Sequence, residues 1–235
     1  MPEDESGGGP EEQMETGSET GGWSDLSLGR IMSFSDGVFA VAITLLVLSI
    51  KLPIVPQSAA DQKLPHEILK LIPIFEAYII SFLIIGLFWI GHHQVFSRFR
   101  RHDRGLLWLN LVFLMTIVFI PFPTSLLSEY STSRTAFIFY AVSLSLSAIM
   151  MTFMLWYGAH NNRLMDVVDS KFYRRFSFGY LDMAAIFLLS IPFSYLNVRF
   201  AKYFWLLIIP TNWYFDHVMN ERLVKKRAEK GGGGG

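Results

Sequence analysis

The sequence predicts an all-α polytopic membrane protein with six transmembrane helices. Of its 235 residues, 51% are hydrophobic and 17% are charged, whereas roughly a quarter of the residues are charged in an average soluble domain. The mean hydropathy of the chain is positive. The charges gather near the two ends and in short segments between long apolar runs. A bilayer demands this separation, because a charge at membrane depth costs several kcal/mol.

Six apolar runs are each long enough to cross roughly 30 Å of hydrocarbon as a helix that rises about 1.5 Å per residue. Pro121 and Pro123 fall inside the third run and predict a kink there. The last two runs are separated only by Asn197, Val198 and Arg199. The predicted spans are 30–50, 72–96, 106–127, 135–157, 178–198 and 200–218.

The two ends of the chain differ in composition from this six-helix domain, which we expect to cover residues 26–220. Residues 1–25 are rich in Gly, Glu, Ser and Thr and are predicted to be disordered. Residues 221–235 form a basic and Gly-rich tail. Most of the 20 Lys and Arg residues fall on the side of the N-terminus and of the second and fourth connections. The positive-inside rule therefore predicts a multi-pass protein of the cell membrane with both termini in the cytoplasm.

Several classes of function lack any signal in the sequence. The formal net charge is zero, which gives no reason to expect a nucleic-acid partner, and the chain has no cysteine. His92 and His93 are adjacent, so their side chains diverge by about 100° on a helix and cannot bind one metal ion together. No nucleophile elbow, phosphate-binding loop or pair of carboxylates is present. We therefore expect no enzyme activity, no metal site and no cofactor.

One apolar stripe runs along the predicted first helix. At about 100° per residue, the side chains of its members point in a common direction. Thr44 carries the one hydroxyl of this first-helix stripe. The stripe could be ordinary packing surface, and the Thr44 hydroxyl could simply bond to a carbonyl of its own helix. The stripe consists of Gly37, Val41, Thr44, Leu45, Leu48 and Leu52.

Asp36 lies one to two turns inside the same helix and points away from the stripe. A carboxyl at this depth needs partners, and Arg30 is too far along the helix to pair with it on one face. The partners must therefore come from other helices. The polar candidates at a similar depth are Trp89, His92 and His93 in the second span and Asn110 in the third.

The string R-x-x-x-F-S-D, formed by Arg30, Phe34, Ser35 and Asp36, resembles the signature of the transmembrane protein 175 family. Three further matches follow in order. They are the W-x-x-H-H-x-x-F run that begins at Trp89, the L-N-L sequence around Asn110, and the P-F-P-T sequence at 121–124. This family consists of endosomal and lysosomal potassium channels in animals and their prokaryotic relatives.

The resemblance implies a channel with one six-helix repeat, which assembles as a homotetramer around a pore lined by the first helix. The sequence has no T-V-G-Y-G filter or pore loop. Selection of potassium would then take place at a narrow apolar constriction with a hydroxyl level, formed by Val41, Thr44, Leu45 and Leu48. For Arg30, Ser35 and Asp36 of the signature, together with Trp89, His92 and Asn110, we expect a structural role as an interhelical polar network that holds the first helix in register with its neighbours.

Two other functions stay open at this point. A proton-coupled secondary transporter could use Asp36 and His92 as titrating groups, although we find no clear inverted repeat of the kind many transporters contain. An intramembrane enzyme is disfavoured because its motifs are missing. The leading hypothesis is a leak-type potassium channel that acts as a homotetramer in a lipid bilayer, with potassium as the permeant ion.

Overall fold

The computed structural model describes residues 27–160 and 170–208, and every regular element in these ranges is helical. The long helices are α1 (Leu28–Leu48), α3 (Ile72–Phe96), α4 (Arg104–Phe119), α6 (Arg134–His160) and α7 (Ser170–Ser194). The shorter ones are η2 (Gln57–Ala59), α2 (Ala60–Lys70), α5 (Pro121–Glu129), α8 (Val198–Tyr203) and η3 (Phe204–Leu207).

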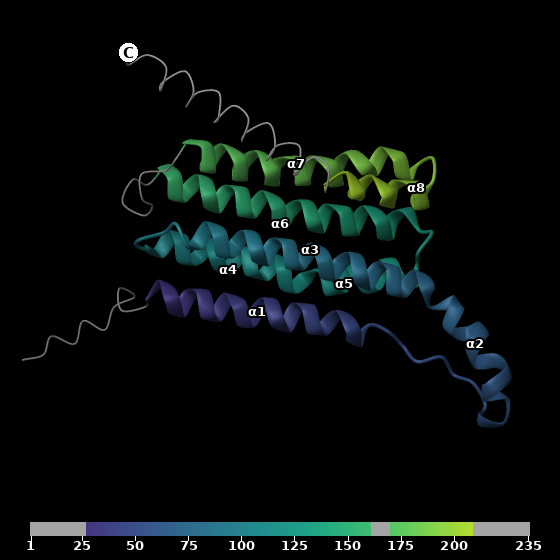
Figure 1. Ribbon diagram of the computed structural model, residues 1–235. Helices are drawn as coiled ribbons and strands as arrows, with labels where there is room; N and C mark the ends of the chain where they lie inside the picture. Colours follow the sequence, from purple (N-terminus) through teal and green to yellow (C-terminus); the bar gives the residue numbers. More distant parts are fainter. Residues whose placement is uncertain (1–26, 161–169, 209–235) are drawn as a thin grey trace, which may run out of the picture.

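The long helices lie side by side in layers that follow the order of the chain (Figure 1). Helix α1 lies at one edge of the bundle and packs on α3, α4 and α5. Helix α6 packs on α4 on one side and on α7 on the other, and α7 with α8 forms the opposite edge. Helix α1 is therefore covered on one side only, whereas α6 lies inside the bundle.

Local sequence explains the limits of α1. The Ser27 side chain caps its N-terminus by accepting a hydrogen bond from the Arg30 amide at 3.3 Å, and such caps stabilise a helix by about 1 kcal/mol. At the other end, the Ser49 hydroxyl donates to the Leu46 carbonyl at 2.7 Å, just before Pro53 excludes further helix. The face toward α3 and α4 buries Ile31, Ser35, Phe39, Ala42 and Leu46.

The third predicted span is divided into α4 and α5 at Ile120. Pro121 has no amide hydrogen to donate to the preceding turn and its ring crowds that turn. Helix α4 therefore ends at Phe119 and α5 begins at Pro121. The two helices together, Arg104–Glu129, are still long and apolar enough to cross a membrane.

The structure confirms five of the six predicted spans as helices of sufficient length and apolarity. The fifth ends at Ser194, earlier than predicted, because Asn197 caps α8 by accepting the Arg199 amide at 2.8 Å. The predicted sixth span is described only as far as 208, and residues 1–25 and 221–235 lie outside the described residues. Helices η2 and α2, which the sequence analysis did not anticipate, project from the bundle beyond the far end of α1 (Figure 1).

Candidate functional site

Five of the six residues of the first-helix stripe lie on the face of α1 that no described helix covers, whereas Leu52 lies beyond the end of the helix at Leu48. Val41, Leu45 and Leu48 are 53%, 38% and 75% exposed, and Gly37 and Thr44 are also exposed. An alanine side chain at Gly37 would meet no atom within 4 Å. Helix α1 thus has two faces of different kinds, a packed face against α3 and α4 and an open face formed by the stripe.

The Thr44 hydroxyl donates to the Val41 carbonyl of its own helix at 2.9 Å. This is the local bond that membrane threonines often form. The bond uses the one hydroxyl hydrogen and leaves the lone pairs of the exposed Thr44 oxygen available. Thr44 can therefore still accept a hydrogen bond or contact a cation there.

A buried hydrogen-bonded chain joins α1 to α3 and α4. Asn110 on α4 donates through Nδ2 to the Ser35 hydroxyl at 3.1 Å, and its Oδ1 lies 2.8 Å from Nε2 of His92 on α3. All three side chains are almost completely buried. The His92 ring also stacks on Phe113 and Phe96. We call Ser35, His92 and Asn110 the Asn110 network.

Asp36 has a separate partner from that network. The Trp89 indole donates to its carboxylate at 2.8 Å, and both residues lie at the surface of the single chain. Four of the sequence candidates are thus distributed over two bonds, Asp36 with Trp89 and His92 with Asn110. The rotation of α1 about its own axis is fixed by the Trp89–Asp36 bond and by the Asn110–Ser35 bond, because Ser35 and Asp36 are neighbours on that helix.

The other two signature residues make neither bond. Arg30 is exposed and forms no ion pair with another described residue. Phe34 is 55% exposed and lies outside the packed face. Of the four signature residues, Ser35 and Asp36 therefore bond to side chains of other helices, whereas Arg30 and Phe34 are exposed and make no such bond.

A second buried polar cluster lies in the half of the bundle remote from Asp36, and the sequence analysis did not identify it. The Ser81 hydroxyl lies 2.7 Å from the Tyr140 hydroxyl and 2.9 Å from that of Thr124. These three residues come from α3, α5 and α6. Thr124 ends the P-F-P-T sequence, and that sequence was the signal that could have led to this cluster.

An ion pair links the segment just after the C-terminal end of α1 to the end of α5. The Lys51 ammonium, just beyond the helix, lies 3.3 Å from the Glu129 carboxylate at the end of α5. Both side chains are exposed to solvent, so the pair adds little to stability. The carboxylate does hold the Lys51 charge toward α5 and away from the open face of α1.

Comparison with known proteins assigns the chain to a family. The family model described as endosomal/lysosomal potassium channel TMEM175 matches residues 30–121. A protein from Streptomyces collinus that is named a potassium channel is 41% identical over 142 residues, which cover 59% of this chain and 68% of the relative. The chain belongs to the TMEM175 family. This membership confirms the expectation that it is not an enzyme.

Two further TMEM175-family comparisons extend over most of the chain. A protein from a Chryseobacterium species, also named a potassium channel, is 31% identical over 180 residues, covering 73% of this chain and 90% of the relative. The crystal structure of a lysosomal potassium-selective channel TMEM175 homolog from Chamaesiphon minutus aligns with a TM-score of 0.68 and 32% identity. That alignment covers 82% of this chain and 98% of the homolog. The helical architecture is thus the TMEM175 fold.

Proposed function

We propose that this protein is a potassium-selective, leak-type channel that assembles as a homotetramer, with the open face of α1 from each subunit lining one central pore. The observation that carries the proposal is the first-helix stripe, an apolar surface with one hydroxyl level that is exposed in the single chain. The names of the relatives from Streptomyces collinus and Chryseobacterium support potassium as the permeant ion.

One subunit cannot enclose an ion path with this stripe, because the stripe covers one side of one helix. Cyclic repetition closes such a surface into a ring, and closed symmetry is the usual form of a homo-oligomer. The packed face of α1 supports the same arrangement, because the Asn110 network and the Asp36–Trp89 bond hold the stripe in a fixed direction away from α3 and α4.

The stripe also suggests how potassium would be selected. Rings of Val41, Leu45 and Leu48 would form apolar levels that exclude water when the pore is narrow. Four Thr44 oxygens between them would provide weak ligands for an ion that has lost part of its hydration shell. Potassium loses its hydration more easily than sodium, so a narrow site with weak ligands favours potassium.

The hydrogen bonds give no support to the proton-coupled transporter. Asp36 and His92 bind different partners, Trp89 and Asn110, so they do not form one titrating pair. For the location we propose the cell membrane, with the N-terminal end of α1 and the basic connection 97–103 on the cytoplasmic side. The distribution of Lys and Arg carries that assignment.

The proposal is tested by recording currents from the purified protein in a planar bilayer with potassium on one side and sodium on the other. We expect a unitary potassium current and a reversal potential that shows potassium selectivity. Thr44→Ala should reduce the potassium-over-sodium permeability ratio several-fold and retain conduction, because it removes the hydroxyl level.

Thr152→Ala is the matched control. Thr152 lies on α6, and its hydroxyl also bonds to a carbonyl of its own helix, that of Ala148, at 3.0 Å. This variant should keep the wild-type selectivity. If Thr44→Ala and Thr152→Ala both match the wild type, the stripe does not form the selective part of the pore.

A further inference from the structure

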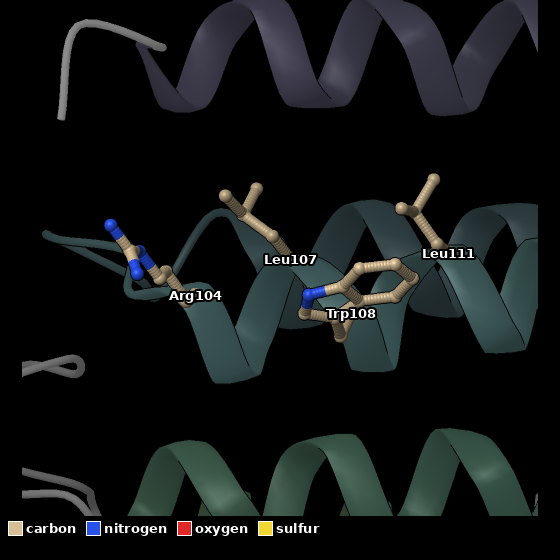
Figure 2. A pocket seen from close by; sticks show the side chains of 4 residues that line it. All are labelled: Arg104, Leu107, Trp108 and Leu111. Carbon is tan, nitrogen blue, oxygen red and sulfur yellow. The ribbon is translucent and has the colours of Figure 1, made fainter. Parts of the chain in front are cut away.

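The outer surface of α4 carries a hollow of about 200 Å³. Four side chains line it, and all come from the first two turns of α4: Arg104, Leu107, Trp108 and Leu111. Figure 2 shows the arrangement in the space between α1 and α6, with Arg104 at one end and Leu107, Trp108 and Leu111 following along the helix. We call this feature the α4 groove.

The α4 groove has a charged end and an apolar length. Arg104 is the first residue of α4, so its guanidinium lies where the span leaves the hydrocarbon. It forms no ion pair with another described residue. The adjacent carboxylate, Asp103, is engaged elsewhere, because it caps the Leu106 amide at 2.8 Å and accepts the Tyr157 hydroxyl at 2.8 Å.

Trp108 gives the α4 groove the character of a membrane interface. Its side chain is 64% exposed, although indole is the largest of the side chains. Tryptophan is enriched at the level of the lipid headgroups, where the ring contacts acyl chains and the N–H group can reach water or phosphate. Leu111 continues the same surface one turn deeper toward the middle of the bilayer.

We propose that the α4 groove binds one anionic phospholipid, with its phosphate on Arg104 and one acyl chain along Leu107, Trp108 and Leu111. Arginine presents parallel N–H donors that match a phosphate group. Basic pockets at the cytoplasmic ends of transmembrane helices bind anionic headgroups by the same chemistry. The inference depends on α4 being in a membrane and not on where the ion pore lies.

A lipid fits this surface better than a neighbouring subunit does. An apolar side chain from a second copy could cover Trp108 and Leu111, but it would leave the Arg104 guanidinium without a partner at the edge of a low-dielectric region, which is unfavourable. A phospholipid supplies both an anion for Arg104 and an apolar chain for Leu107, Trp108 and Leu111.

The test is native mass spectrometry of the purified assembly titrated with phosphatidylglycerol or with zwitterionic phosphatidylcholine. The wild type should bind phosphatidylglycerol more tightly, and Arg104→Gln should weaken that binding by about tenfold, as the loss of a charge-assisted contact of ~1.4 kcal/mol predicts. Arg104→Lys keeps the charge and should weaken it less. Trp108→Ala should weaken the binding of both lipids.

Arg101→Gln is the matched control, because Arg101 is exposed and does not line the α4 groove. It removes the same charge three residues earlier and should leave phosphatidylglycerol binding within about twofold of the wild type, as expected for a charge that makes no direct contact. If Arg101→Gln and Arg104→Gln weakened phosphatidylglycerol binding equally, the lipid would be held by general electrostatic attraction to the basic surface and not by the α4 groove. That result would overturn the proposal.

Two further outcomes would also overturn it. Inorganic phosphate that displaces phosphatidylglycerol at equal concentration would show a phosphate site without a lipid. The chain has no cysteine, so Trp108→Cys introduces a single thiol. Its efficient cross-linking to a neighbouring subunit by a short bis-maleimide would show that a second copy fills the groove.

Discussion

Helices α1 and α6 have almost the same mean hydropathy but very different surroundings. In the most apolar 18 residues of α1, 28% are buried inside the chain, against 50% in α6. Helix α6 has protein on two sides, α4 and α7, whereas α1 has protein on one. Hydropathy thus reports that a helix avoids water, and it does not report whether protein, lipid or a pore surrounds it.

The two helices also use polar side chains differently. On α6, Ser143, Ser145 and Ser147 are buried and donate mainly to carbonyls of their own helix. They act as small residues that permit close approach of α7. On α1, Ser35 and Asp36 bond to side chains of other helices. The serines of α6 therefore serve packing, while its hydrogen bonds to side chains outside the helix come from Tyr140 and Tyr157. On α1, the short polar side chains themselves fix the rotation of the helix through two specific hydrogen bonds.

Of the changes considered, breaking the Asn110 network should have the largest effect on stability and assembly. Asn110→Ala leaves the buried His92 ring without its partner and removes the donor to Ser35, at about 1–3 kcal/mol for each group left unpaired. We expect loss of the assembled protein in size-exclusion chromatography and a lower melting temperature. The control is Ser147→Ala on α6, whose hydroxyl bonds only within its helix and which should stay close to the wild type. Equal stability of the two variants would show that α1 and α6 are held in the same way.

Two glycines test the packed and open surfaces directly. An alanine Cβ at Gly91 would overlap the Tyr180 ring of α7, so Gly91→Ala should destabilise the fold by about 1–3 kcal/mol through overpacking. Gly37 lies on the open face with free space around it, and Gly37→Ala should leave stability unchanged or raise it by up to about 1 kcal/mol. Thermal unfolding monitored by tryptophan fluorescence measures both.

Gly37→Ala has a second expected result that sharpens the comparison. If the first-helix stripe lines the pore, four added methyl groups lower the unitary current although the protein is as stable as the wild type. An unchanged current in a stable Gly37→Ala protein would mean that the open face of α1 does not line the pore.

Polar substitutions on α1 and α6 should distinguish a helix face that lines the pore from one that does not. Val41→Asn or Leu48→Asn should raise the unitary conductance several-fold, because polar side chains wet an apolar constriction. Leu146→Asn on the exposed face of α6 is the control and should leave the conductance unchanged. Unitary currents in a planar bilayer give the answer, and an increase for Leu146→Asn alone would contradict the assignment of the two faces.

The smallest effect is expected at the far end of α1. Glu129→Gln removes the carboxylate partner of the Lys51 ammonium. If four copies of α1 line the pore as proposed, four unpaired positive charges near its mouth lower the local potassium concentration. At roughly 0.01 M salt, where charges act over about 30 Å, the current from that side should fall by less than twofold, and at roughly 1 M salt the difference should vanish. The double variant Glu129→Gln with Lys51→Gln should restore the wild-type current at low salt. A loss that persists at high salt would rule out this electrostatic cause.

The sequence predicted the spans well and the pairing of polar groups poorly. The predicted second span coincides with α3, and the first agrees with α1 to within two residues, because long apolar runs and their caps define helices. The sequence analysis named Trp89, His92, His93 and Asn110 as candidate partners of Asp36, but it could not say that Trp89 alone bonds to Asp36 while Asn110 bonds to His92 and Ser35. Which side chains meet depends on the rotation of each helix about its axis. A helix that is apolar on all sides gives no sequence pattern from which this rotation can be predicted.

Two features lacked a usable local signal. Helix α2 is short, mostly polar on one side and contains Pro65, so no membrane-length run marks it. Ser81, Thr124 and Tyr140 are distant in sequence, and the P-F-P-T sequence marks only Thr124, so nothing local indicates its two partners. The pore role of Val41, Thr44, Leu45 and Leu48 stays a prediction, since a single chain defines the open face but not what covers it.

The layered order of the bundle has a consequence for biogenesis. Ser35 and its partner Asn110 are 75 residues apart, and Asp36 and Trp89 are 53 apart. At about 5–20 residues per second, a ribosome needs roughly 4 to 15 seconds to proceed from Ser35 to Asn110. Ser35 is protected during that interval by its bond to the Ile31 carbonyl at 2.9 Å, whereas Asp36 has no partner on α1. The nascent first helix therefore enters the bilayer with one carboxyl unmatched and depends on the synthesis of α3 to retain it.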